Sequence, residues 1–336
     1  MKILLSGYHN PHYPTITEYM EQAIISLGHE LVAFDDRRHI IPGRIRRRCR
    51  WINMLDIRHI NKNLTDLVDA SKPELTVITG GHRIFPESVE IMKSLGVKTA
   101  LWTIDPPRTF QPLIKAAPHY DFVFCQGTEA IELFRHSGIL NARWLPMACA
   151  PHYHKPVELS ESDRIKFGND IVFVGSYYPE RAELFENLSC FDFALWGTGW
   201  ENLTKNSPLR KRIRGYHTRP EEWLKIYSAS KIVLSTHYHD ALGRFPVYQA
   251  SPRVFEILAC GAFQMCDNQR DVFSLFHDGR HLIKFLNGKD LVVKIQYYLE
   301  NHQERQAITR QGREEVLKLH TYQDRIQELL AIVASS

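Results

Sequence analysis

A cation and a carboxylate lie close together in the run SPRVFEILACGAFQMCD, residues 251–267. Ser251 followed by Pro252 is typical of a helix N-cap and its first helical residue, so a helix is expected to begin here. The free N–H groups and positive dipole of such a helix end favour a phosphate group. Arg253 adds a positive charge in the first turn, and Glu256 lies three residues further, on the same side.

Glu256 suits a ribose, because one carboxylate can accept hydrogen bonds from two vicinal hydroxyls. Together with Arg253, it predicts a site for a phosphate-bearing nucleotide. The alternative is that Arg253 and Glu256 only pair with each other on a solvated helix face.

Small residues follow the predicted strands of the C-terminal half. Gly175 and Ser176 end the strand IVFVG, where a small residue lets backbone amides approach phosphate oxygens. Arg181 then opens the next helix, either to neutralise a diphosphate or as an ordinary surface residue. Two further strand-end loops supply the remaining candidates of this half, namely Gly197, Gly199, Tyr216 and His217.

Ionisable side chains follow three predicted strands of the N-terminal half: His9, His82 and Asp105. A side chain of this kind can act as a general base that deprotonates an acceptor group. Two prolines after Asp105 would hold its loop rigid, which suits a positioned carboxylate but also an ordinary turn. We expect the base to be Asp105, with His9 and His82 as rivals.

Histidines gather in three places, in HYHD at 237–240 and in the pairs His9/His12 and His152/His154. Imidazole and carboxylate groups are common metal ligands. The spacing supports no ligand set strongly, so no metal site is predicted.

The segments that must position these residues alternate between β-rich runs and amphipathic stretches, which predicts parallel sheets. The expected strands are KILLS, ELVAF, LTVIT, TALWT, FVFC and ARWL in a first series, and IVFVG, FALWG, KIVLS, AFQMC and HLIKF in a second. A capping box of Thr15 and Glu18 begins the first helix, and Gly28 ends it. Ligands of open α/β sheets bind at the carboxyl ends of such strands.

The chain of 336 residues exceeds what one hydrophobic core usually organises, so two α/β domains are expected. Prolines and the polar stretch ELSESDRIKFGND place the boundary near residues 150–168. The first domain then comprises residues 1–155 and the second residues 165–336, with a last helix that packs back on the first.

The composition, with 44% hydrophobic and 24% charged residues and no low-complexity tract, is that of a globular protein and excludes a fibrous chain. The opening run MKILLSG is too short for a signal peptide or a membrane span. Six cysteines without CxxC spacing are expected to be free thiols in a reducing cytoplasm.

Seven arginines lie between residues 37 and 50, although the formal net charge of the chain is only +4. Arg44, Arg46, Arg47 and Arg48 could attract an anionic acceptor, a lipid surface or nucleic acid. The alternative is a solvated connecting segment.

A family resemblance runs through both halves of the chain. Segments of the C-terminal half resemble, in order, the C-terminal domain of GT-B glycosyltransferases, specifically the spore-maturation, CgeB-type glycosyltransferases: FVGSYYPERAELF, FALWGTGW, RGYHTRPEEWLKIYSASKIVLSTHY, SPRVFEILACGAFQMCD and HTYQDR. The segments LWTIDPPR, YDFVFCQGTEAIELFRHSG and ARWLPMACAPHYHKP resemble the matching N-terminal half. The resemblance implies an α/β, GT-B fold of two Rossmann-like domains facing each other across a cleft.

The resemblance also implies the reaction, which is transfer of a sugar from a nucleoside diphosphate to an acceptor without a metal or other cofactor. The donor would be a UDP-sugar, with its ribose on Glu256. Tyr216 or His217 would border the nucleobase, unless these rings pack inside the domain. Arg181 and Arg253 would stabilise the leaving diphosphate.

One position departs from the family pattern. Related retaining families carry two glutamates spaced E-x7-E, and Tyr248 stands where the first would be. The sugar and the stereochemical outcome therefore stay open. A sugar-nucleotide epimerase of similar architecture and a non-catalytic protein that binds a nucleotide or glycan are the alternative functions.

Overall fold

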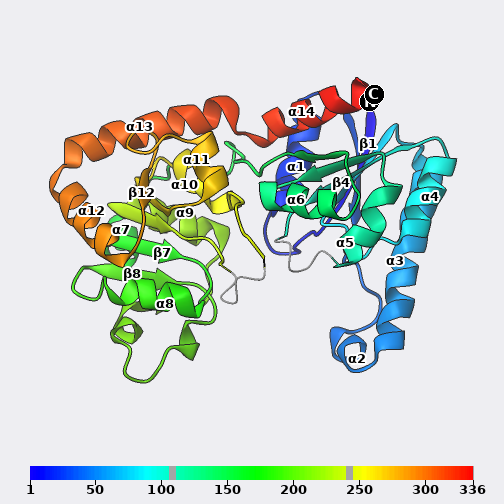
Figure 1. The fold of residues 1–336 in the computed structure, drawn as a ribbon. Helices are drawn as coiled ribbons and strands as arrows, with labels where there is room; N and C mark the ends of the chain where they lie inside the picture. Colours follow the sequence, from blue (N-terminus) through cyan, green and yellow to red (C-terminus); the bar gives the residue numbers. More distant parts are fainter. Residues whose placement is uncertain (106–110, 240–244, 336) are drawn as a thin grey trace. The chain divides into compact units, whose positions relative to one another are not determined.

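The computed structural model describes residues 1–105, 111–239 and 245–335. The chain divides into two compact units (Figure 1). Unit 1 comprises Met1–Pro146 and Tyr322–Ser336, and unit 2 comprises Met147–Thr321. Each unit contains its own six-stranded parallel sheet.

Unit 1 has the strand order β2-β1-β3-β4-β5-β6. All six strands of the first predicted series are confirmed: β1 (Lys2–Gly7), β2 (Glu30–Asp35), β3 (Leu75–Thr79), β4 (Lys98–Thr103), β5 (Phe122–Cys125) and β6 (Ala142–Trp144). Its helices are α1 (Ile16–Ser26), α2 (Gly43–Arg48), α3 (Arg50–Ser71), α4 (Pro86–Ser94), α5 (Gln111–Ala116), the 3₁₀ turn η2 (Ala117–His119), α6 (Thr128–His136) and α14 (Tyr322–Ala334).

Local sequence signals explain how α1 begins and ends. Thr15 and Glu18 form the predicted capping box at its start. Gly28 has a φ of 81°, a left-handed conformation that a glycine adopts without steric penalty. The helix then packs against α14, where the rings of Tyr19 and Tyr322 lie 6.1 Å apart. The C-terminal helix is therefore part of unit 1.

Unit 2 has the strand order β12-β11-β10-β7-β8-β9. Its strands are β7 (Ile171–Val174), β8 (Phe193–Trp196), β9 (Ile213–Gly215), β10 (Ile232–Ser235), β11 (Gln264–Asp267) and β12 (Ile283–Phe285). Its helices are α7 (Glu161–Phe167), α8 (Pro179–Glu186), η3 (Trp200–Asn202), η4 (Pro208–Arg212), α9 (Pro220–Ala229), α10 (Pro252–Ala259), α11 (Arg270–Leu275), α12 (Gly288–Glu300) and α13 (His302–Leu319).

The edge strand β9 is absent from the second predicted series of strands, although Tyr216 and His217 were expected in a strand-end loop. It has three residues, Ile213–Gly215, of which only the first is apolar, so no alternating pattern marks it. Its register against β8 is interrupted between Leu195 and Trp196. The five predicted strands of this half are confirmed.

The first crossing between the units lies at Pro146–Met147, a few residues before the expected boundary at 150–168. Met147 and Cys149 are fully buried, and the Cys149 N–H donates to the His320 carbonyl at 3.0 Å inside unit 2. The polar stretch at residues 158–170, which we interpreted as a linker, contains the helix α7, and Ser160 caps this helix. Prolines and polar residues predicted a boundary here, but the buried side chains of Met147 and Cys149 assign the chain from residue 147 onward to unit 2.

The structure also shows the state of the cysteines and the character of the helices. All six cysteines are free, as predicted. No helix in the described ranges combines the length and the apolar character needed to cross a membrane.

Candidate functional site

Two strand ends of unit 2 and the start of α10 approach one another closely at glycines. Gly197 has a φ of 132°, and a Cβ added there would lie 2.2 Å from the carbonyl oxygen of Gly175. Gly199 is also left-handed, with a φ of 86°. A Cβ added at Gly175 would lie 2.9 Å from Nη2 of Arg253. The loops after β7 and β8 and the start of α10 can therefore lie close together because Gly175 and Gly197 have no side chain.

The backbone of this loop is only partly available to a ligand. The Gly175 N–H donates to the Trp196 carbonyl at 2.8 Å, so the expectation that this amide faces a phosphate is wrong. The Gly175 carbonyl accepts from Nε1 of Trp200 at 2.9 Å. In the part of the chain that the structure describes, the N–H of exposed Ser176 has no acceptor. Ser176 is therefore the residue of this pair that can donate to a ligand.

Arg181 is buried and fully engaged by its own unit. Its Nε and Nη2 donate to the hydroxyl and carbonyl of Thr236, both at 2.8 Å, and Nη1 donates to the Ser176 carbonyl at 2.7 Å. Burial, reinforced by the positive charge of Arg253, lowers its pKa to about 9. Arg181 therefore connects the loop after β7 to the end of β10. It is not an ordinary surface residue, and its guanidinium group is already hydrogen-bonded within unit 2.

We predict that Arg181→Ala lowers the free energy of unfolding by about 2 to 3 kcal/mol, because the buried Thr236 carbonyl loses its donor. Arg214→Ala removes an exposed arginine of the same unit and is expected to leave stability unchanged. Urea denaturation of both variants measures the difference. If Arg181→Ala matched Arg214→Ala in stability but lost turnover, a directly catalytic cation would be favoured instead.

Arg253 and Glu256 lie in the first two turns of α10, and both are half-buried. The guanidinium carbon of Arg253 is 5.5 Å from the ring centre of Phe173, and that of Arg181 is 5.1 Å from it. Two cations therefore gather beside Gly175, and Arg253 is the one that reaches the loop surface. Positive groups placed in this way are able to stabilise a phosphate group.

The carboxylate of Glu256 has no hydrogen-bond donor among the described residues. Burial raises its pKa to about 7, and the charge of Arg253 opposes this shift only in part. Arg253 and Glu256 form no ion pair, so the alternative of a mutual pair on a solvated face is wrong. Glu256 is therefore a partly accessible carboxylate near the positive charge of Arg253.

A buried Asp267–His237 pair fixes the start of α10. Nδ1 of His237 lies 2.7 Å from Oδ1 of Asp267, and the His237 N–H donates to Oδ2 at 2.9 Å. The Ser251 N–H donates to Nε2 of the same ring at 3.1 Å, which makes Nδ1 the protonated nitrogen. Burial would raise the pKa of Asp267, but its interactions with His237 outweigh burial and hold that pKa well below its usual value.

Sequence reasoning missed this positioning role. His237 was considered only as a metal ligand, and Asp267 was noted only as the end of its run. His237, Cys266 and Asp267 do place potential ligand atoms within 4.8 Å of one another, but hydrogen bonds already use both His237 ring nitrogens. Asp240, the last residue of HYHD, lies outside the described residues.

Tyr216 and His217 directly follow β9. Both side chains are exposed, Tyr216 by 44%. Packing inside the domain is therefore wrong as an account of these residues. An exposed ring at a strand end is available to stack on a planar ligand.

In unit 1, two of the three predicted base candidates meet. Nε2 of His82, after β3, lies 2.9 Å from Oδ2 of Asp105, after the neighbouring strand β4. The Asp105 side chain is 44% exposed. An imidazole that orients an accessible carboxylate is a suitable arrangement for proton transfer.

His9 lies apart from this pair in its contacts. Its Nε2 is 2.7 Å from Oε1 of Glu21, and its Nδ1 is buried without a hydrogen-bond partner among the described residues. Burial alone would lower the His9 pKa, but Glu21 outweighs burial and raises it.

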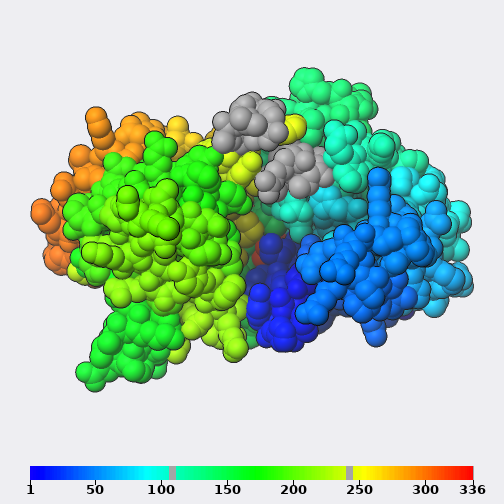
Figure 2. All heavy atoms as spheres, turned by 90° about the horizontal axis from the view of Figure 1, so that it is seen from below, coloured from blue at the N-terminus to red at the C-terminus, as the bar shows by residue number. Residues whose placement is uncertain are grey.

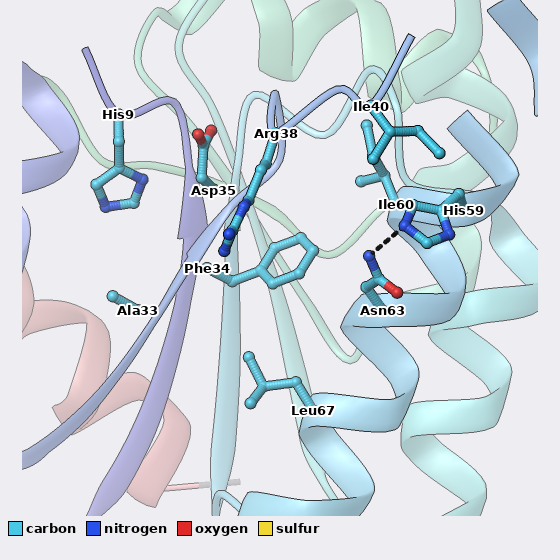
Figure 3. A pocket seen from close by; sticks show the side chains of 10 residues that line it. All are labelled: His9, Ala33, Phe34, Asp35, Arg38, Ile40, His59, Ile60, Asn63 and Leu67. Carbon is cyan, nitrogen blue, oxygen red and sulfur yellow. Dashed lines mark hydrogen bonds between the residues drawn. The ribbon is translucent and has the colours of Figure 1, made fainter. Parts of the chain in front are cut away.

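His9 also lines a pocket of about 660 Å³ between β2 and α3. Figure 3 shows the Arg38 side chain ending beside Phe34, with His9 on one side of them and the apolar side chains of Ile60 and Leu67 on the other. The pocket therefore combines polar groups with an apolar wall.

Known proteins resemble this chain in part of its sequence and in its fold. Residues 181–331 match a family model described as "Glycosyl transferase-like". A search of curated proteins finds no match to the sequence.

Solved structures match the whole fold. A sucrose-phosphate synthase from Thermosynechococcus elongatus is 13% identical with a TM-score of 0.70, and HepE from Anabaena in complex with UDP-glucose is 12% identical with a TM-score of 0.66; each match covers 100% of both chains. A glycosyltransferase from Rickettsia africae is 13% identical, has a TM-score of 0.68 and covers 98% of this chain and 97% of that one. Residues 181–331 thus match a glycosyl transferase-like family model, in a chain with the GT-B fold.

Proposed function

We propose that this protein transfers a sugar from a UDP-sugar to an acceptor, as a glycosyltransferase of the CgeB type that acts in the cytoplasm. The observation that carries the proposal is Glu256, a half-buried carboxylate without a hydrogen-bond donor, beside Arg253 at the start of α10. The glycosyl transferase-like match over residues 181–331 supports it, as does the HepE structure with UDP-glucose.

The donor is proposed to lie across the strand ends of unit 2. Glu256 accepts hydrogen bonds from the two ribose hydroxyls, and the Ser176 N–H and Arg253 hold the diphosphate. Tyr216 or His217 borders the uracil. The loops carrying Gly175, Gly197 and Gly199 can approach one another this closely only because these three residues have no side chain.

In the reaction, the bond between the anomeric carbon and the β-phosphate oxygen breaks, and an acceptor oxygen forms the new bond to that carbon. Negative charge builds on the leaving UDP, and Arg253 stabilises it in place of a metal ion. Arg181 contributes by holding the Ser176 carbonyl and, with it, the loop.

The acceptor is proposed to bind unit 1. Its proton passes to Asp105, oriented by His82, if the configuration inverts; it passes to the leaving phosphate if the configuration is retained. The pocket beside His9 supports an acceptor with both polar and apolar parts.

Incubation with UDP-glucose tests the proposal. Without a sugar acceptor, we expect binding by calorimetry and slow release of UDP by hydrolysis, in which water accepts the sugar. Both should be strongly weakened in Glu256→Gln and kept in Glu183→Gln, an exposed glutamate of α8. Chromatography of the nucleotide sugar separates the alternatives. Recovery of an isomerised UDP-sugar would indicate an epimerase, and tight binding without UDP release or transfer would indicate a binding protein.

A further inference from the structure

The segment formed by α2 and the first turns of α3 carries exposed cations and exposed apolar side chains together. We call it the α2–α3 surface and define it by its exposed residues: Arg44, Ile45, Arg47, Arg48, Arg50, Trp51, Met54, Leu55 and Arg58. Figure 1 shows this segment at the far end of α3, away from the sheet of unit 1. Figure 2 shows it in mid-blue on the face of unit 1 turned to the viewer.

The charge of this surface is unopposed. Between residues 37 and 58 the sequence contains one carboxylate, Asp56, and it is buried. His39 lies 2.6 Å and Arg46 3.3 Å from it, and Arg46 also donates to the Ile41 carbonyl at 2.8 Å. Arg46 is therefore an internal residue, which corrects its place in the predicted anion-binding set, and Asp56 neutralises none of the five exposed arginines.

The apolar side chains are exposed to an unusual degree for a helix. Trp51 is 66% exposed, Leu55 48%, Ile45 47% and Met54 38%. Trp51, Met54, Leu55 and Arg58 follow the i, i+3, i+4, i+7 spacing of one helix face. Clustered exposed apolar groups of this kind mark a surface that contacts a membrane or another molecule.

The packing of α3 leaves its first turns free. The buried residues of this helix begin at Asp56 and continue with Ile60, Asn61, Leu64 and Val68. Residues 50–55 thus contribute no buried side chain to the core of unit 1, and neither does α2. Substitutions here should leave the fold intact.

We propose that the α2–α3 surface docks on a membrane containing anionic phospholipids. Arginines near such a membrane are attracted by its negative surface potential, and exposed Trp and Leu side chains insert at the boundary between headgroups and acyl chains. A nucleic acid would satisfy the arginines but would leave Trp51, Met54 and Leu55 in water. The apolar half of the surface therefore favours lipid. This inference is independent of the proposed sugar transfer.

Vesicle sedimentation of the full chain tests the proposal. The protein should sediment with vesicles of phosphatidylcholine mixed with phosphatidylglycerol, and much less with phosphatidylcholine alone. The double variant Arg47→Gln/Leu55→Ala should bind at least about 10-fold more weakly, since each basic residue and each apolar side chain contributes separately. Arg135→Gln/Leu140→Ala, which removes an exposed arginine and a leucine exposed by 79% elsewhere in unit 1, should bind like the wild type.

Three results would overturn the proposal. The first is equal sedimentation with neutral and anionic vesicles, and the second is equal loss of binding in both double variants. The third is binding to a short DNA duplex that is at least as tight as to the vesicles and unaffected by Trp51→Ala. Thermal denaturation of each variant confirms that the protein remains folded, and UDP-glucose binding should be the same in all of them.

Discussion

Arg253→Ala is expected to lower turnover of a UDP-sugar by about 10² to 10³, the usual loss when one prearranged charge stabiliser is removed. Arg253 reaches the loop at Gly175, whereas Arg181 is held by three hydrogen bonds, so of the two arginines we propose Arg253 as the one that meets the developing charge of the leaving group. Donor affinity should change less, because that charge is largest in the transition state.

Separate measurements of turnover and of UDP-sugar affinity check this prediction. Arg214→Ala, which removes an exposed arginine of the same unit, serves as the matched control, and circular dichroism reports on folding. Turnover of Arg253→Ala within about threefold of the wild type, far short of the expected range, would remove Arg253 from the catalytic machinery.

Glu256→Gln is expected to weaken UDP-sugar binding by about 10- to 150-fold, corresponding to the roughly 1.5 to 3 kcal/mol of a hydrogen bond to a charged group. In the wild type this affinity should also fall as the pH drops below about 7, where the carboxyl becomes protonated. Calorimetry over a pH series measures both effects, and the affinity of Glu256→Gln should show no transition near pH 7.

The same substitution should stabilise the free protein. The pKa of Glu256 is raised in the folded state from 4.5 to about 7, so folding opposes its ionisation. The resulting loss of stability is absent below about pH 4.5, grows as the pH rises and is complete above about pH 7. At pH 8, Glu256→Gln should be more stable by up to about 3 kcal/mol. If Glu256→Gln bound UDP normally and were no more stable than the wild type, Glu256 would neither bind the ligand nor destabilise the free protein.

The sequence predicts most of the fold because periodicity and capping are local. Five strands of the second series and the start of α10 at Ser251 and Pro252 are found where apolar runs and a proline predict them. The short strand β9 escapes prediction, because two of its three residues are not apolar.

The candidate site was predicted less completely, because its contacts join distant parts of the chain. Arg181 is bound by Thr236, 55 residues away, so no local pattern reveals that its donors are occupied. Asp267 and His237 are 30 residues apart, and only the parallel pairing of β10 and β11 brings them together. Glu256 was identified from spacing, yet its raised pKa follows from burial that spacing cannot give.

The C-terminal helix α14 also bears on how the chain matures during synthesis. It completes unit 1, where Ile326, Leu329 and Val333 are buried and Nε of Arg325 donates to the Pro146 carbonyl at 3.0 Å. A ribosome delivers these residues only after all of unit 2 has emerged. The unit whose synthesis starts first therefore cannot complete its fold until unit 2 has been synthesised, and until then α1 lacks the helix that packs against it. Nascent chains stalled before residue 322 should consequently depend on chaperones more than released chains do.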